Sequence, residues 1–194
     1  MEVLFNMETK KSIFTSATFG FISFLLAFAL GSILTYSTGL PLIGGLLNGV
    51  ITGMVLTIGL ISRKFKFNAT IMWLVFSVFA TLTTTLGPPG IYKIMIGLIA
   101  GLLWDFFYAF ISKYKTWGLY LGGLLGSASI MFTLVFFLSF GFGKNSFETL
   151  EKYKEKFIII LVMNLIITII GIILGNIVYR KRLCNLPQFK NLRD

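Results

Sequence analysis

The chain has 194 residues, of which 56% are hydrophobic and only 12% are charged, and its mean hydropathy is +0.89. Soluble domains carry about 25% charged residues, so this composition excludes an ordinary soluble domain and indicates that lipid surrounds most of the chain. The formal net charge of +10 comes from short clusters of Lys and Arg at the ends of apolar runs. This placement is typical of topology signals and of contact with anionic headgroups, and we expect no nucleic-acid partner.

Apolar runs bounded by charges or by Gly and Pro predict six transmembrane helices, because about 20 apolar residues cross the hydrocarbon layer. A membrane β-barrel would need alternating polar and apolar residues, whereas the run 158–173 is apolar on every face. The first run is longer than the apolar part of a signal peptide, so we expect it to be retained. The predicted fold class is an all-α integral membrane bundle, a single domain over residues 1–194, with spans at about 12–35, 40–62, 69–87, 90–112, 117–141 and 157–180.

The distribution of lysine and arginine predicts the orientation of the chain in the membrane. With a cytoplasmic N-terminus, most basic residues fall on inside segments, and most of the lysines in the outside loop 141–156 are offset by Glu148, Glu151 and Glu155. We therefore expect both termini to be cytoplasmic. The basic residues on the inside would be Lys10, Lys11, Arg63, Lys64, Lys66, Lys113, Lys115, Arg180, Lys181, Arg182, Lys190 and Arg193, which is 12 of 17.

The chain has no histidine and a single cysteine, Cys184. Ser-His-Asp catalysis, His-ligated zinc or haem and His proton relays are therefore excluded, and one cysteine forms no intrachain disulfide. A membrane enzyme would need a nucleophile with its base, or several carboxylates at depth, but Asp105 is the only acidic residue inside a predicted span. We expect no catalytic activity, no metal site and no cofactor.

Small residues recur at every fourth position on several predicted spans, so that each row lines one face of a helix. In lipid such rows let helix backbones approach closely. The plainer interpretation is packing within the bundle, and the alternative is that one row docks another membrane protein, for which the row on the first span is our preferred candidate. The rows are Gly45, Gly49 and Gly53; Gly118, Gly122 and Gly126; Gly97 and Gly101; Gly171 and Gly175; and Ser23, Ala27 and Gly31 on the first span.

Asp105, Asn48 and Asn164 are polar groups predicted to lie at membrane depth, where an unpaired polar group is costly. Asp105 should face the bundle interior, either bonded to a neighbouring Asn, Ser or Tyr in a structural or coupling role, or in contact with substrate. Asn48 and Asn164 both fall in outer halves of spans, so they could converge on one cavity or form separate interhelical hydrogen bonds. Tyr36, Tyr92 and Trp73 could wall an outward pocket around a flat organic ligand.

The six-span architecture, with two local stretches, resembles the substrate-binding S component of energy-coupling-factor (ECF) transporters. The turn Leu86–Gly90 (LGPPG) leads into the glycine-rich segment Gly97–Asp105, and Leu40–Leu42 (LPL) leads into Gly44, Gly45 and Gly49. On the first span, Ser23–Ala27–Gly31 stands where that family commonly carries an A-x-x-x-A row that meets the coupling subunit. The family's nickel and cobalt members carry a histidine-bearing N-terminal segment, which is absent here, so a metal substrate is not expected.

The resemblance implies a protein of the prokaryotic plasma membrane that captures a vitamin or similar small organic solute from outside. A transmembrane coupling subunit and two cytoplasmic ATPases would supply the energy, and the chain itself carries no G-x-x-x-x-G-K-[ST] motif. Lys93 could pair with a carboxylate or phosphate of the substrate, or it could extend to the interface. The expected substrate-binding residues are Tyr36, Thr84, Thr85, Tyr92, Lys93, Asn145 and Asn164.

Two other functions are compatible with the sequence. One is a non-catalytic membrane scaffold or assembly factor that binds partner helices through its glycine rows. The other is an autonomous secondary transporter, which is disfavoured because the two three-span halves show no inverted repeat.

Overall fold

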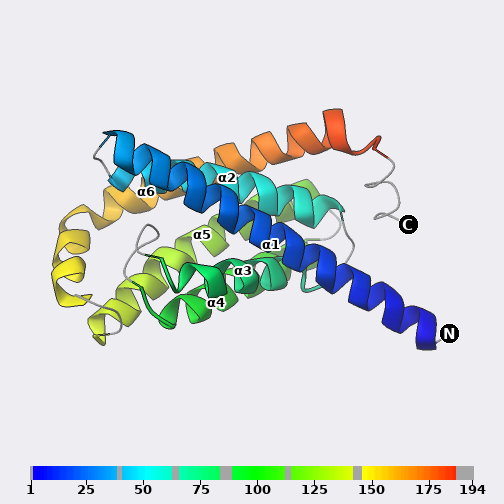
Figure 1. Ribbon diagram of the computed structural model, residues 1–194, viewed down its shortest axis with the longest axis horizontal. Coiled ribbons are helices and arrows are strands. Elements are labelled where there is room, and N and C mark those ends of the chain that lie inside the picture. Colours follow the sequence, from blue (N-terminus) through cyan, green and yellow to red (C-terminus); the bar gives the residue numbers. More distant parts are fainter. Residues whose placement is uncertain are drawn as a thin grey trace.

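The computed structural model describes residues 2–38, 41–62, 66–83, 89–111, 115–141 and 146–186, and every regular element in these ranges is helical. This confirms the all-α prediction, and Figure 1 shows the helices packed as one bundle. The last helix continues into a π-helical turn, Tyr179–Leu183. The α-helices are α1 (Glu2–Thr38), α2 (Pro41–Ser62), α3 (Asn68–Ala80), α4 (Tyr92–Phe110), α5 (Lys115–Ser139) and α6 (Ser146–Val178).

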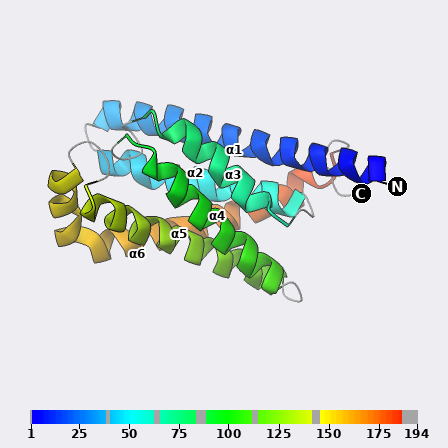
Figure 2. The same ribbon diagram turned by 90° about the horizontal axis from the view of Figure 1, so that it is seen from below.

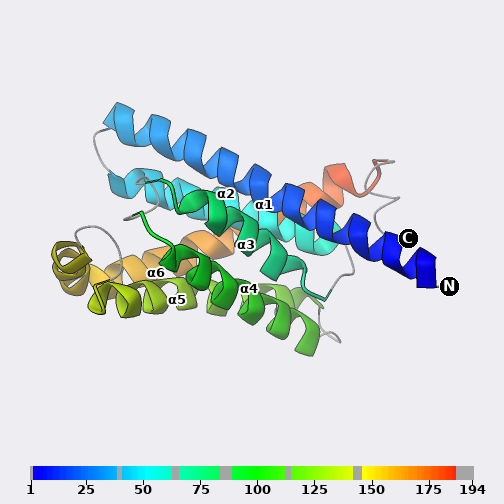
Figure 3. The ribbon, with the colours of Figure 1, turned by 60° about the horizontal axis from the view of Figure 1, so that its bottom comes forward.

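The six helices form a closed ring in which each helix packs against two principal neighbours. The order around the ring is α1, α2, α6, α5, α4, α3 and back to α1. Four of these contacts join helices that follow each other along the chain, whereas α2 with α6 and α1 with α3 join helices that do not. The start of α1 and the end of α6 lie at the same end of the bundle in all three views (Figures 1, 2 and 3).

Four helical segments in the described ranges are long and apolar enough to cross a membrane: Thr9–Ile33, Tyr92–Phe110, Thr116–Ser139 and Phe157–Leu183. The segments Gly49–Ser62 of α2 and Asn68–Ala80 of α3 are apolar but shorter. Large apolar side chains on the outside of the bundle, such as Phe14, Phe110 and Ile158, are 74–76% exposed. A surface of this kind is stable next to lipid and not next to water, so the chain has the character of a helical membrane protein.

The observed helix ends differ from the predicted spans in three places. Helix α1 begins at Glu2 and α6 begins at Ser146, so both extend through charged residues beyond the apolar run. Helix α3 ends at Ala80, well before residue 87, because the chain turns at Thr81–Thr83. Helix α5 is terminated near Gly141, whose positive φ of 76° is a conformation that glycine adopts readily.

The glycine rows lie where helices cross inside the bundle. A Cβ on Gly171 would stand 2.6 Å from the Val50 carbonyl oxygen of α2, and one on Gly122 would stand 2.8 Å from the Trp104 carbonyl oxygen of α4. A Cβ on Gly101 would stand 2.5 Å from Thr70 Cα of α3. The close approach of the helices at these contacts (the seams of the bundle) therefore requires glycine, which has no side chain. This supports internal packing as the role of these rows. Gly45 lies outside the residues whose contacts are described.

The small-residue row of α1 also faces the inside of the bundle. Ser23 and Ala27 have no exposed surface, and Ala27 packs with Phe24, Phe76 and Ala80 in an apolar cluster between α1 and α3. Gly31 is buried as well. Burial at these three positions corresponds to packing within the chain, and docking of a coupling subunit on this row stays a prediction.

Candidate functional site

Asp105 of α4 binds the N-terminal end of α3. Its Oδ1 accepts a hydrogen bond from the Ala69 amide at 2.9 Å, and its Oδ2 accepts from the Thr70 amide and the Thr70 hydroxyl, both at 2.7 Å. The first amides of a helix have no partner within it, and Phe67, which precedes α3, offers no side-chain cap. Asp105 therefore caps α3 from a neighbouring helix, and its negative end meets the positive end of the helix dipole.

Lys93 binds the opposite end of the same helix. Its Nζ donates to the Ala80 carbonyl oxygen at 2.9 Å and to the Thr83 carbonyl oxygen at 2.8 Å, and the side chain is only 7% exposed. Carbonyl groups at a helix C-terminus attract a cation. The ammonium group of Lys93 is thus directed to the end of α3, and contact of Lys93 with a solute stays a prediction.

The two charges of α4 thus hold α3 from both ends. Asp105 and Lys93 are twelve positions apart, about 18 Å along a helix, and the 13 residues of α3 span about 20 Å. Because these two lengths match, Asp105 can bind the first turn of α3 while Lys93 binds its last carbonyl groups. Asp105 therefore has a structural role, as one of the two sequence interpretations expected, although its partners include backbone amides and a threonine instead of Asn, Ser or Tyr.

Asn68 extends this polar contact to two further helices. The Ser16 hydroxyl of α1 donates to Asn68 Oδ1 at 2.6 Å, and Asn68 Nδ2 donates to the Gly59 carbonyl oxygen of α2 at 2.8 Å. All three side chains of this contact region, Ser16, Asn68 and Asp105, are buried. The start of α3 is therefore joined to α1, α2 and α4 by buried hydrogen bonds.

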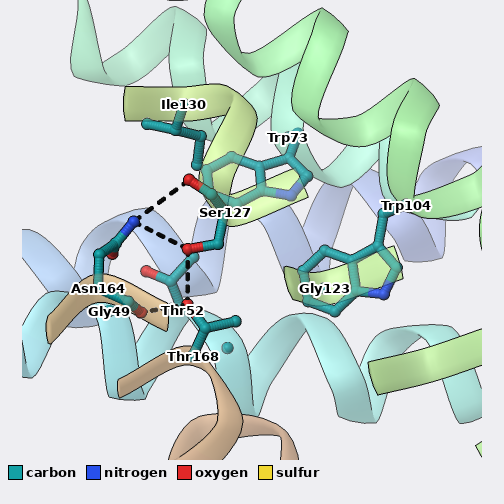
Figure 4. Close-up of a pocket in the computed structure, with 10 residues that line it drawn as sticks. Gly49, Thr52, Trp73, Trp104, Gly123, Ser127, Ile130, Asn164 and Thr168 are labelled. Atoms are coloured by element: carbon teal, nitrogen blue, oxygen red, sulfur yellow. Dashed lines mark hydrogen bonds between the residues drawn. The ribbon is translucent and has the colours of Figure 1, made fainter. Parts of the chain in front are cut away.

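A cavity lies at the centre of the ring, between α2, α3, α4, α5 and α6 (Figure 4). Its volume is about 40 Å³, which holds a few water molecules or one small chemical group. Trp73 and Trp104 stand on one side, and Asn164 and Thr168 on the other. The lining residues are Gly49, Thr52, Gly53, Trp73, Trp104, Gly123, Ser127, Ile130, Asn164 and Thr168.

A hydrogen-bond network joins α5 and α6 along one wall of this cavity. Asn164 Nδ2 donates to the Ser127 carbonyl oxygen at 3.2 Å and to Ser127 Oγ at 2.8 Å. The Thr168 hydroxyl donates to the Asn164 carbonyl oxygen at 2.8 Å and lies 2.8 Å from Ser127 Oγ. The network is uncharged, and it presents an amide and two hydroxyl groups to the cavity (Figure 4).

The opposite wall contains two hydrogen-bond donors that lack a partner. The indole nitrogens of Trp73 and Trp104 are buried and meet no acceptor in the described part of the chain. An indole N–H can only donate, and a buried donor without an acceptor costs about 1–3 kcal/mol. Both nitrogens are inaccessible to a water-sized probe, so the tryptophans present ring carbons to the cavity and its polar groups lie on the α5–α6 side.

The predicted site residues are distributed over different parts of the molecule. Asn164 and Trp73 line the cavity, whereas Tyr36 is 88% exposed at the end of α1. Tyr92 is 2% exposed and packs its ring against Phe137 of α5, outside the cavity lining. Of the remaining predicted residues, Thr84, Thr85, Asn145 and the side chain of Asn48 lie outside the described residues.

Sequence reasoning missed Thr52, Trp104, Ser127 and Thr168 as lining residues. Two signals were available: Asn164 and Thr168 are spaced i,i+4 on one helix face, and Ser127 follows directly after the glycine row of α5.

For metals, the described ranges contain no group of three or more His, Cys, Asp or Glu side chains close enough to hold an ion.

Comparison of the chain with protein-family models, curated proteins and solved structures finds no significant match. The assignment of a function therefore rests on the geometry and the charge distribution of this chain.

Replacing Asn164 with leucine should lower the free energy of unfolding by about 1 kcal/mol, because it removes two interhelical hydrogen bonds between α5 and α6. Thermal unfolding of the purified protein in detergent measures the change. Asn176→Leu, farther along the same helix and outside this network, is the matched control and should change the melting temperature less. Equal effects from both variants would show that the network does not hold α5 to α6.

Proposed function

We propose that this chain is the substrate-binding subunit of an ECF-type importer, which captures a small organic solute from outside the cell. The observation that carries the proposal is the central cavity, because five helices line it and its walls combine two tryptophan rings with the amide of Asn164 and the hydroxyl groups of Ser127 and Thr168. Ligand sites in helical bundles are built in this way, from a few polar groups in a mostly apolar wall. The energy would come from a coupling subunit and cytoplasmic ATPases.

The proposed topology has six spans with both termini in the cytoplasm. Two observations support it: the ends of α1 and α6 lie at the same end of the bundle, and exposed basic residues gather there, including Lys10, Lys11 and Arg180–Arg182. Positive residues favour the cytoplasmic side. Helix α2 has 22 residues, about 33 Å, and spans the bilayer, whereas α3 crosses it together with the turn that follows.

The alternative of a scaffold that docks partner helices through glycine rows has less support. Gly101, Gly122 and Gly171 all lie against backbone atoms of neighbouring helices within the chain. A scaffold of this kind would need such rows on its outer surface.

Native mass spectrometry of the protein purified in mild detergent tests the function. We expect a non-lipid organic solute to copurify and to be released by denaturation. Retention of phospholipid alone, together with no solute binding after delipidation, would contradict the proposal and favour the scaffold.

Labelling with a membrane-impermeant maleimide tests the topology, because Cys184 is the only cysteine of the chain. In intact spheroplasts, Cys184 should react only after the membrane is permeabilised. A Tyr36→Cys variant in a Cys184→Ser background should react at once, since position 36 is 88% exposed at the opposite end of α1. Immediate labelling of both positions would place them on the same side and overturn the proposed topology.

A further inference from the structure

The end of the bundle that contains the start of α1 and the end of α6 carries a group of exposed basic side chains. Three of them follow each other in the π-helical turn after α6, two lie near the start of α1, and one lies just before α3. We call this group the basic patch. Its members are Lys10, Lys11, Lys66, Arg180, Lys181 and Arg182.

The acidic side chains that the structure describes do not neutralise this patch. Asp105 is buried and accepts hydrogen bonds from the first turn of α3, and Glu151 lies near the opposite end of α6. The complete sequence has the same asymmetry. The segments 1–11, 63–67, 111–116 and 179–194, which adjoin the helix ends on this side, hold 12 basic and three acidic residues, whereas the segment 141–156 holds four lysines and three glutamates.

The basic patch is distributed around the end of the bundle and does not line a single pocket. Its residues belong to α1, to the turn after α6 and to the residues before α3, and α6, α2, α1 and α3 are consecutive in the ring. The turn after α6 contacts α2, and the bond between the Ser16 hydroxyl and Asn68 Oδ1 fixes the start of α3 beside α1. The geometry therefore fits a charged surface that meets several small anionic groups at once.

Exposed apolar side chains next to the patch indicate its depth in the membrane. Phe14, three residues after Lys11, is 76% exposed, and Ile177, three residues before Arg180, is 44% exposed. Phe67, which follows Lys66, is 54% exposed. Three residues of helix rise only about 4.5 Å, so side chains suited to hydrocarbon and side chains suited to water occupy adjacent levels.

This change of character within one helical turn is typical of the boundary between the acyl chains and the headgroups. Lysine and arginine have long apolar stems, and these let the charged group extend from the edge of the hydrocarbon to the phosphates. An acidic protein in the aqueous phase would be met by charges farther from the apolar surface. The depth of the patch therefore favours phospholipid as its partner.

We infer that the basic patch binds the headgroups of anionic phospholipids in the leaflet at this end of the bundle. Lysine and arginine donate charge-assisted hydrogen bonds to phosphate oxygens, and a cluster of four to eight basic residues beside a membrane helix attracts lipids with a net negative charge. The contact holds the start of α1 and the end of α6 at the level of the headgroups. The inference goes beyond the proposed function and does not depend on solute binding in the cavity.

Electron paramagnetic resonance of spin-labelled lipids tests the inference on the full-length protein in phosphatidylcholine vesicles. Spin-labelled phosphatidylglycerol and phosphatidylcholine with the same acyl chains differ in headgroup charge, and the immobilised fraction of each gives their relative association constants. At about 20 mM NaCl, phosphatidylglycerol should associate about threefold or more strongly. The ratio should fall close to one at about 1 M NaCl, where the Debye length is about 3 Å.

Two results of this measurement would overturn the inference. One is equal association of both lipids at low salt, which would assign the patch to an acidic protein surface in place of lipid. The other is a preference that persists at about 1 M NaCl, because such a preference would not come from exposed charges.

Variants of the turn after α6 locate the contact. The triple substitution Arg180→Gln, Lys181→Gln and Arg182→Gln should reduce the preference for phosphatidylglycerol about twofold or more, since it removes three of the six exposed charges. The matched control, Arg180→Lys with Arg182→Lys, keeps every charge and should leave the preference unchanged. Circular dichroism verifies the folding of both variants. A full preference in the glutamine variant, or an equal loss in the lysine variant, would contradict binding through headgroup charge at this turn.

Discussion

Replacing Asp105 with alanine should lower the free energy of unfolding by about 2–6 kcal/mol, because two backbone amides of α3 lose their only acceptor in a buried position. The Ala69 and Thr70 amides donate hydrogen bonds to the two carboxyl oxygens of Asp105. The side chain of Phe67, which precedes α3, has no acceptor that could replace these oxygens as a cap. Helix α3 has only 13 residues, so loss of its first turn affects a large part of it. Thermal or denaturant unfolding in detergent measures the loss.

Three further variants separate capping from packing. Asp105→Asn keeps the size of the side chain but turns one acceptor into a donor, so it should cost about 1–3 kcal/mol. Thr70→Val removes only the hydroxyl bond at 2.7 Å and should cost less. Lys93→Met should also cost less than Asp105→Ala, since carbonyl oxygens tolerate a lost donor better than amides tolerate a lost acceptor. If Asp105→Ala and Thr70→Val are equally mild, Asp105 does not hold α3.

The Gly171→Ala substitution should destabilise the protein by about 1–3 kcal/mol through overpacking of the seam between α2 and α6. A Cβ at this position would stand 2.6 Å from the Val50 carbonyl oxygen and 3.1 Å from Gly53 Cα. Both are backbone atoms, so one helix as a whole would have to move. Because α2 with α6 is one of the two ring contacts between helices distant in sequence, the ring would loosen there.

Gly53→Ala is the matched control for this seam. Gly53 faces Gly171 across the same crossing, but its added Cβ would stand 3.4 Å from its nearest neighbours, which is ordinary van der Waals contact. The melting temperature should therefore fall clearly for Gly171→Ala and little for Gly53→Ala. A larger loss for Gly53→Ala would contradict the packing described for α2 and α6.

Asp105 shows where residue patterns stop being informative about the site. Its position in an apolar run predicted burial and a polar partner. Its partners are the Ala69 and Thr70 amides and the Thr70 hydroxyl, and backbone groups leave no trace in a pattern of residue types. The pattern of residue types was silent on Lys93 for the same reason, since its partners include the carbonyl oxygens of Ala80 and Thr83.

The sequence by itself determined that this protein is a bundle of apolar helices, because a chain that is 56% hydrophobic and 12% charged must satisfy its backbone within helices in lipid. It also determined that glycine rows would line the seams, since close helix approach needs small residues at i,i+4 spacing. Tertiary structure alone decided the ring order, in which α6 meets α2, and brought Trp73, Trp104, Ser127 and Asn164 around one cavity. Those contacts join residues far apart in the chain, and their partners depend on how whole helices are rotated and crossed, which no local pattern specifies.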